Sequence, residues 1–86
     1  MLVQSSEIST IGRIHDDRAK WRVMVQAWPD EAGYAGRLVF AADGATASLG
    51  TREGPPALRG PTREAVVSQA YDLSETHLRA MLYSLG

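Results

Sequence analysis

The stretch that decides the fold is a pair of apolar segments, Trp21 to Trp28 (WRVMVQAW) and Gly36 to Ala42 (GRLVFAA), joined by the turn-rich residues 29–33 (PDEAG). Successive side chains of a β-strand point to opposite faces. One face of the first segment therefore carries Trp21, Val23, Val25 and Ala27, and the other carries Arg22, Met24, Gln26 and Trp28. This alternation predicts a β-hairpin with one face packed against a core.

The opposite face of the hairpin is unusually apolar for a surface in contact with water. With Leu38 and Phe40 facing the core, the outer face gathers aromatic, thioether and guanidinium side chains. These types are enriched at protein interfaces. The candidate interface consists of Arg22, Met24, Trp28, Arg37 and Val39. Three alternatives are open: the segment Leu2 to Ile14 folds over this face, Trp28 is a lone exposed aromatic, or the face stacks a ligand or nucleic acid.

Shorter strands flank this hairpin. Residues 8–15 are rich in β-branched side chains and favour a strand, although Ile8, Ile11 and Ile14 are spaced by three rather than two. The polar residues 15–18 then form the turn into the next strand. Asp43 and Gly44 predict a tight hairpin turn leading to a third strand at 45–51. Residues 52–61 are rich in glycine and proline and predict a crossing loop with at most a short edge strand at 57–59.

The last quarter of the chain has helical periodicity. Thr62 is a good N-cap, and Glu64 follows in the first turn, where a carboxylate is favoured. An apolar stripe continues to Leu85, interrupted by Ser74, which is itself a good N-cap. Residues 62–85 therefore form either one long helix or two short ones, and a break near Leu73 is favoured because one helix of roughly 33 Å would overhang a sheet of roughly 20 Å.

Length and composition limit the number of domains, the classes of partner and the cellular location that we expect. The 86 residues predict a single small α+β domain, 1–86, with residues 1–7 expected to be flexible. Nine lysines and arginines against ten acids give a net charge of -1, so nucleic acid is an unlikely partner. The chain has no cysteine, no basic and apolar leader, and no apolar run long enough for a membrane span. We therefore expect a cytoplasmic protein without a membrane partner.

Groupings that could carry chemistry are few. His15, Asp16 and Asp17, with the distant His77, are the best candidates for metal binding or acid–base work, but they match no known ligand spacing. A hairpin turn explains the first three residues equally well. Arg52, Arg59 and Arg63 lie near the start of the helix, where anions can bind, but neighbouring glutamates offset their charge. We expect no enzyme activity and no cofactor.

A run of strands followed by Gly60, Pro61, Thr62, Arg63, Glu64 and Ala65 at the start of a helix resembles the small antitoxin domains of the HicB type. Such domains often show Gly-x-Thr-x-Glu-Ala at this place. The resemblance spans about Trp21 to Leu73, and the proline-rich turn of the family after its second strand is missing here. It implies a regulatory, antitoxin-like domain that binds a partner protein or a small ligand.

The sequence thus predicts an α+β fold: an antiparallel meander of three or four strands followed by one long or two short C-terminal helices packed on one sheet face. The leading functional hypothesis is a small, non-enzymatic interaction module of the cytosol. It would act by self-association, as a homodimer, or by binding a protein partner across the outer sheet face.

Overall fold

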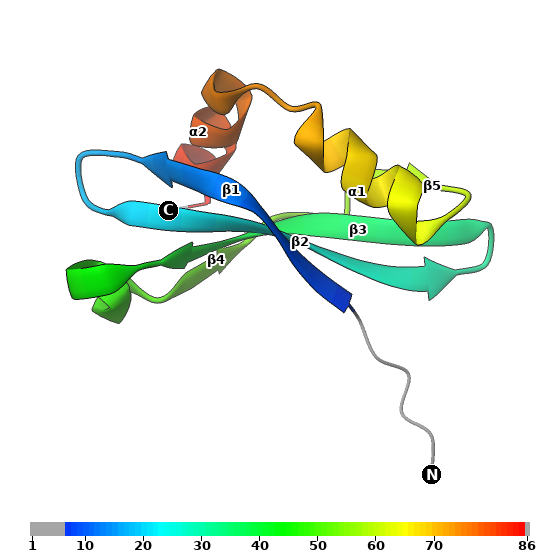
Figure 1. Ribbon diagram of the computed structural model, residues 1–86, viewed down its shortest axis with the longest axis horizontal. Helices are drawn as coiled ribbons and strands as arrows, with labels where there is room; N and C mark the ends of the chain where they lie inside the picture. Colours follow the sequence, from blue (N-terminus) through cyan, green and yellow to red (C-terminus); the bar gives the residue numbers. More distant parts are fainter. Residues whose placement is uncertain (1–6, 86) are drawn as a thin grey trace, which may run out of the picture.

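The computed structural model describes residues 7–85 and has the predicted α+β architecture, with an antiparallel sheet and two helices packed on one of its faces (Figure 1). The first three strands are β1 (Glu7–His15), β2 (Lys20–Asp30) and β3 (Gly33–Ala42). The remaining elements are the 3₁₀ helix η1 (Gly44–Leu49), strands β4 (Thr51–Glu53) and β5 (Leu58–Gly60), and helices α1 (Arg63–Tyr71) and α2 (Glu75–Ser84). Residues 1–6, which make up most of the segment expected to be flexible, lie outside the described residues.

The sheet is built around the central hairpin of β2 and β3. The sheet order is β1-β2-β3-β4, and β5 pairs with the other end of β3. Trp21 lies opposite Ala42, and Asp30 lies opposite Gly33, so only Glu31 and Ala32 form the turn. The hairpin is therefore longer and its loop shorter than the sequence suggested, because Pro29 and Gly33 both belong to strands.

The alternation along β2 sets the core as predicted. Trp21, Val23 and Val25 are fully buried, and they face Phe40 and Leu38 of β3 across the register. The helices complete this layer with four buried residues, which are Val66 and Ala70 of α1 and Leu78 and Leu82 of α2. Trp28, by its place in the alternation, lies on the opposite face, so the predicted facing of the strand is confirmed.

Strand β1 is confirmed, and a bulge explains its irregular spacing. Thr10 lies opposite Met24 and Gly12 opposite Val23, which leaves Ile11 as an extra residue in the register. A bulge shifts the alternation by one residue. Ile11 and Ile14 therefore both pack against the core although they are three apart, whereas Ile8 is 56% exposed.

The turn between β1 and β2 is organised by one carboxylate. The Asp16 side chain is only 3% exposed and accepts hydrogen bonds from the backbone N–H groups of Arg18 and Ala19 and from the Arg18 guanidinium. Burial raises the pKa of Asp16, but these hydrogen bonds outweigh it and lower the pKa to about 2. Arg18 and Arg52 also stack over the buried Trp21 ring, at 5.4 and 5.7 Å from its centroid.

The third strand predicted for residues 45–51 is wrong. These residues form η1, because the Asp43 side chain accepts a hydrogen bond from the Gly44 N–H and Thr46 Oγ1 donates to the Asp43 carbonyl. Asp43 therefore acts as an N-cap rather than as part of a hairpin turn. The next strand, β4, begins at Thr51, and the short strand expected near Ala57 is found as β5.

The C-terminal stripe divides into two helices, as favoured above. Thr62 Oγ1 accepts from the Ala65 N–H at the start of α1, and Ser74 Oγ accepts from the His77 N–H at the start of α2. Both are N-caps of the expected kind. Within residues 7–85, no helix has the length and apolar character that crossing a bilayer requires.

Close packing of α1 on the sheet depends on glycine. A Cβ added at Gly36 would come within 2.5 Å of Val66 Cγ1 and 3.0 Å of the Gln26 carbonyl oxygen. A Cβ at Gly60 would come within 2.8 Å of the Ala65 Cβ. The two glycines therefore allow the first turn of α1 to lie directly on β3 and β5.

We expect Gly36→Ala to lower the free energy of unfolding by about 1–3 kcal/mol, because the new methyl overpacks the contact with α1. Gly12→Ala is the matched control, since a Cβ there meets no atom within 4 Å. Urea unfolding of both variants measures the difference. Equal stability of the two would show that α1 is not held this close to the sheet.

We expect Asp16→Asn to lower the free energy of unfolding at neutral pH by about 2 kcal/mol, through loss of charge-assisted hydrogen bonds. Because the pKa of Asp16 falls from 3.8 to about 2 on folding, its stabilisation is complete above the unfolded value and is lost as pH falls through about 2. Urea unfolding at a series of pH values should show a smaller loss of stability over this range in the variant. Asp17→Asn, at the exposed neighbouring position, is the control, and an identical acid response in both would refute the role of Asp16.

Candidate protein interface

The outer sheet face is the surface of β1–β5 that points away from the helices. Both α-helices lie on the other side of the sheet (Figure 1), so neither α1 nor α2 covers it. All five residues of the predicted interface lie on this face. Met24 lies opposite Val39, and Arg37 lies opposite Gln26, beside the Trp28–Ala35 pair. Arg22 lies farther along β2, opposite Ala41.

Trp28 and Arg37 contact each other on this face. The Arg37 guanidinium lies over the Trp28 ring, 5.7 Å from its centroid. Arg37 Nε donates to Gln26 Oε1 at 2.8 Å, and Arg37 Nη1 lies 3.4 Å from Glu53 Oε1. Three neighbours thus fix the orientation of one guanidinium against an aromatic ring, which leaves the outward side of the pair available for contact.

Val39 differs from the other four predicted residues in its exposure. It is 6% exposed, whereas Arg22, Met24, Trp28 and Arg37 are half-buried. Its register neighbours are Met24 on β2 and Glu53 on β4. Ala35, between Trp28 and Arg59, is 2% exposed. Val39 and Ala35 therefore form the floor of the face, and the longer side chains around them form its accessible surface.

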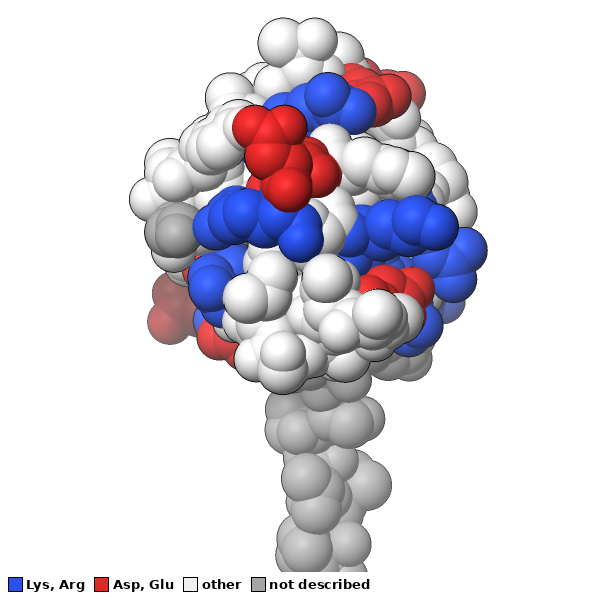
Figure 2. Space-filling view, turned by 90° about the vertical axis from the view of Figure 1, so that its left-hand side faces the viewer, with Lys and Arg blue, Asp and Glu red and all other residues white. Residues whose placement is uncertain are grey.

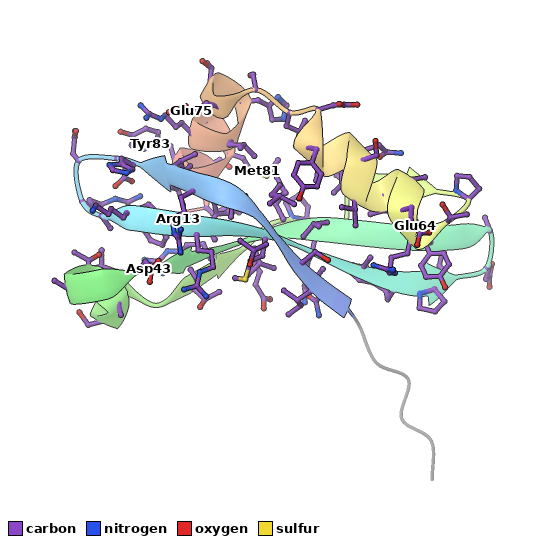
Figure 3. The ribbon with its side chains drawn as sticks, viewed as in Figure 1. Arg13, Asp43, Glu64, Glu75, Met81 and Tyr83 are labelled. Atoms are coloured by element: carbon purple, nitrogen blue, oxygen red, sulfur yellow. The ribbon has the colours of Figure 1, made fainter. Side chains whose placement is uncertain are left out.

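Charged residues that the sequence reasoning missed border this face. Arg13 and Arg22 share Asp43, with nitrogen–oxygen distances of 3.3 and 3.5 Å, and Figure 3 shows Arg13 and Asp43 close together. Arg59 pairs with Asp30 at 2.8 Å. Arg13 points outward only because of the bulge in β1. Arg59 meets Asp30 only because β5 pairs with β3. Neither position could be predicted from the local sequence pattern.

These ion pairs position the cations more than they stabilise the fold. The side chains of Arg13, Arg22 and Arg59 are 41–65% exposed, and exposed pairs contribute about 0–1 kcal/mol each. The hydrogen bond from the Gly44 N–H lowers the pKa of Asp43, desolvation opposes this, and the charges of Arg22 and Arg13 lower it further. Figure 2 shows basic and acidic side chains next to one another at the end of the molecule that carries η1.

Cations nevertheless exceed carboxylates on the outer sheet face. Its described cations are Arg13, Lys20, Arg22, Arg37 and Arg59, and its described carboxylates are Asp30, Asp43 and Glu53. Five positive against three negative side chains give this face a charge of +2, whereas the whole chain carries -1. The face is therefore the electropositive side of a slightly acidic protein.

The other candidate groupings do not assemble into sites. No cluster of three or more histidine, aspartate or glutamate side chains within residues 7–85 could hold a metal ion. The Asp16 carboxylate accepts hydrogen bonds from the turn between β1 and β2. His15 and His77 line different cavities. Of the three arginines near the start of α1, Arg52 stacks on Trp21, Arg59 pairs with Asp30, and Arg63 contacts Glu64, so they form no common anion site.

Comparison with protein-family models, with curated proteins and with solved structures finds no match to this chain. The resemblance of Gly60 to Ala65 to HicB-type antitoxins therefore stays a prediction from that motif. In the structure the motif is the turn that leads from β5 into α1, with Thr62 as the N-cap.

We expect Trp28 and Arg37 to be energetically coupled by about 0.5–1 kcal/mol, the size of a cation–π contact at a partly exposed site. A double-mutant cycle with Trp28→Leu and Arg37→Met, followed by urea unfolding, measures this coupling. The control cycle combines Trp28→Leu with Arg22→Met, six residues away along β2. Equal coupling in the two cycles would show that the contact has no specific energy.

Proposed function

We propose that this chain is a non-enzymatic interaction module that binds an acidic surface of a partner protein through the outer sheet face. The residues that would make the contact are Arg22, Met24, Trp28 and Arg37, above the floor formed by Val39. The single observation that carries the proposal is the Trp28–Arg37 pair, held in place on the sheet face that α1 and α2 leave uncovered.

The composition of the face supports a protein partner. Tryptophan and arginine are the residues most often found at the energetic centres of protein interfaces. The five strands have 9, 11, 10, 3 and 3 residues, so at about 3.3 Å per residue and about 4.8 Å between strands the sheet face spans about 570 Å². That area is close to the roughly 600 Å² per partner found at the lower end of specific complexes.

The charge of the face favours an acidic partner over a second copy stacked face to face. Two copies would oppose surfaces of the same sign, whereas an acidic protein surface would be complementary. Nucleic acid is less favoured, because the chain as a whole carries a net charge of -1 and offers no extended positive field to a phosphate backbone. Masking of a partner in the manner of an antitoxin is one biological role that fits this surface. The cytoplasmic location stays a prediction.

We expect short peptides in which glutamates flank a leucine to bind at Trp28, because they combine acidic and apolar groups. The measurement is a titration of the ¹⁵N-labelled protein followed by NMR. The Trp28 indole signal and the amide signals of Met24 and Arg37 should shift, while the buried Trp21 indole signal should not. Trp28→Ala should weaken binding about tenfold, the usual effect of removing a central aromatic.

Peptides with lysine in place of glutamate are the control for charge, and a single-stranded oligonucleotide is the control for partner class. Circular dichroism checks that the Trp28→Ala variant is folded. Shifts confined to the helix side of the sheet, or equal shifts with the lysine peptides, would contradict the proposal. Stronger shifts with the oligonucleotide would replace the protein partner with nucleic acid.

A further inference from the structure

A cavity of about 210 Å³ lies on the helix side of the sheet, where β3, the segment leading into β5 and α2 meet. Its floor is Leu38 of β3, which is 2% exposed and belongs to the hydrophobic core. Five further apolar residues line it, from the segment before α2, from α2 and from the segment around β5: Leu73, Met81, Pro55, Ala57 and Leu58. The cavity is therefore an apolar hollow at the border of the core.

The walls of this cavity are held by contacts within the chain. The Gly54 N–H donates to the Leu38 carbonyl at 2.8 Å, and the Ala57 N–H donates to the Pro55 carbonyl at 2.8 Å. The consecutive prolines at 55–56 also restrict the backbone of this segment. A Cβ added at Gly54 would lie 3.4 Å from Met81 Sδ, so Met81 packs closely on the same segment. A ligand would not have to order a loop in order to bind.

A single polar side chain belongs to this cavity. Among the described residues that line it, only His77 has a polar side chain, and none is a carboxylate. His77 is exposed, whereas Leu38 is buried, so the cavity runs from an apolar floor to a polar rim. The backbone N–H of His77 donates to Ser74 Oγ at the start of α2, which leaves the imidazole ring out of the N-cap. The rim therefore offers a ring N–H as a hydrogen-bond donor.

The volume and the lining together select a class of ligand. An engineered cavity of about 150 Å³ lined by apolar side chains takes up benzene, and the larger volume here leaves room for one small substituent on such a ring. Water in an apolar hollow has few polar partners, so its displacement by a ring favours binding. An imidazole donates a hydrogen bond in both protonation states, and its charged form attracts an anion and repels an ammonium group.

We propose that this cavity, the His77 pocket, binds a small monocyclic aromatic carboxylate. The ring lies against Leu38, Leu73 and Met81, and the carboxylate accepts a hydrogen bond from the His77 ring. The His77 pocket and the outer sheet face are on opposite sides of the sheet. The inference therefore does not rest on the proposed function.

The test is an NMR titration of the full chain with benzoate, using protein labelled with ¹³C at the methionine methyl groups. We expect the Met81 methyl signal and the His77 ring signals to shift in a saturable manner. The Met24 methyl signal, on the outer sheet face, is the internal control and should not move. Toluene, which has the ring alone, should shift Met81 but not His77. Benzylamine, which reverses the charge, should bind about tenfold more weakly than benzoate.

Variants separate the ring site from the carboxylate site. His77→Leu should weaken benzoate binding about tenfold and leave toluene binding unchanged, because only the hydrogen bond to the carboxylate is lost. His15→Leu is the matched control, since His15 lines a different cavity. Ala57→Trp, followed by the Met81 signal, and Met81→Trp, followed by the His77 signals, fill the pocket from two elements and should abolish binding of both probes. Circular dichroism checks that each variant is folded.

Absence of a saturable shift at Met81 with either probe would overturn the proposal. Benzoate binding that survives both tryptophan substitutions would also overturn it. Equal binding of benzoate by His77→Leu and by the unaltered chain would refute the assignment of the carboxylate to His77. Benzoate shifts at Met24 that disappear in Arg37→Met would place the anion on the outer sheet face and refute the His77 pocket. Failure of acidic peptides to bind at Trp28 would leave the pocket unaffected, so the two proposals fail separately.

Discussion

The structure depends on the two-residue period of β2. Trp21, Val23 and Val25 are fully removed from water on one face. Their burial fixes the side chains of the residues between them on the opposite face. A shift of one position would expose three large apolar side chains, each worth about 1.5–3 kcal/mol when buried, and the domain could not tolerate that loss. The outward direction of Met24 and Trp28 is therefore a consequence of core packing.

That constraint connects the fold to the proposed function. Because the helices pack on the face of Trp21, the opposite face is free to display a guanidinium stacked on an aromatic ring. On the helix side, two cavities lie next to β1, and Tyr71 of α1 lines both of them. A partner bound to the outer sheet face would therefore leave these cavities uncovered.

Much of this arrangement could be predicted from the sequence, because the signals are local. The alternation in β2 and β3, the N-caps Thr62 and Ser74, and the break between the two helices are all encoded within a few neighbouring residues. The expected third strand failed because Asp43 caps a 3₁₀ turn, which competes with a hairpin for the same residue types. The ionic border of the interface could not be predicted, since Arg59 meets Asp30 only through the pairing of β5 with β3.

The extra residue in β1 has a consequence for how this strand can vary. Ile11 stands outside the one-to-one register, so the residues on either side of it are in phase with β2 independently of each other. Loss of Ile11 would leave every other side chain of β1 on its present face, whereas loss of one residue elsewhere in the strand would turn part of it over. Sequence length at this edge of the sheet can thus change by one residue while the architecture is conserved.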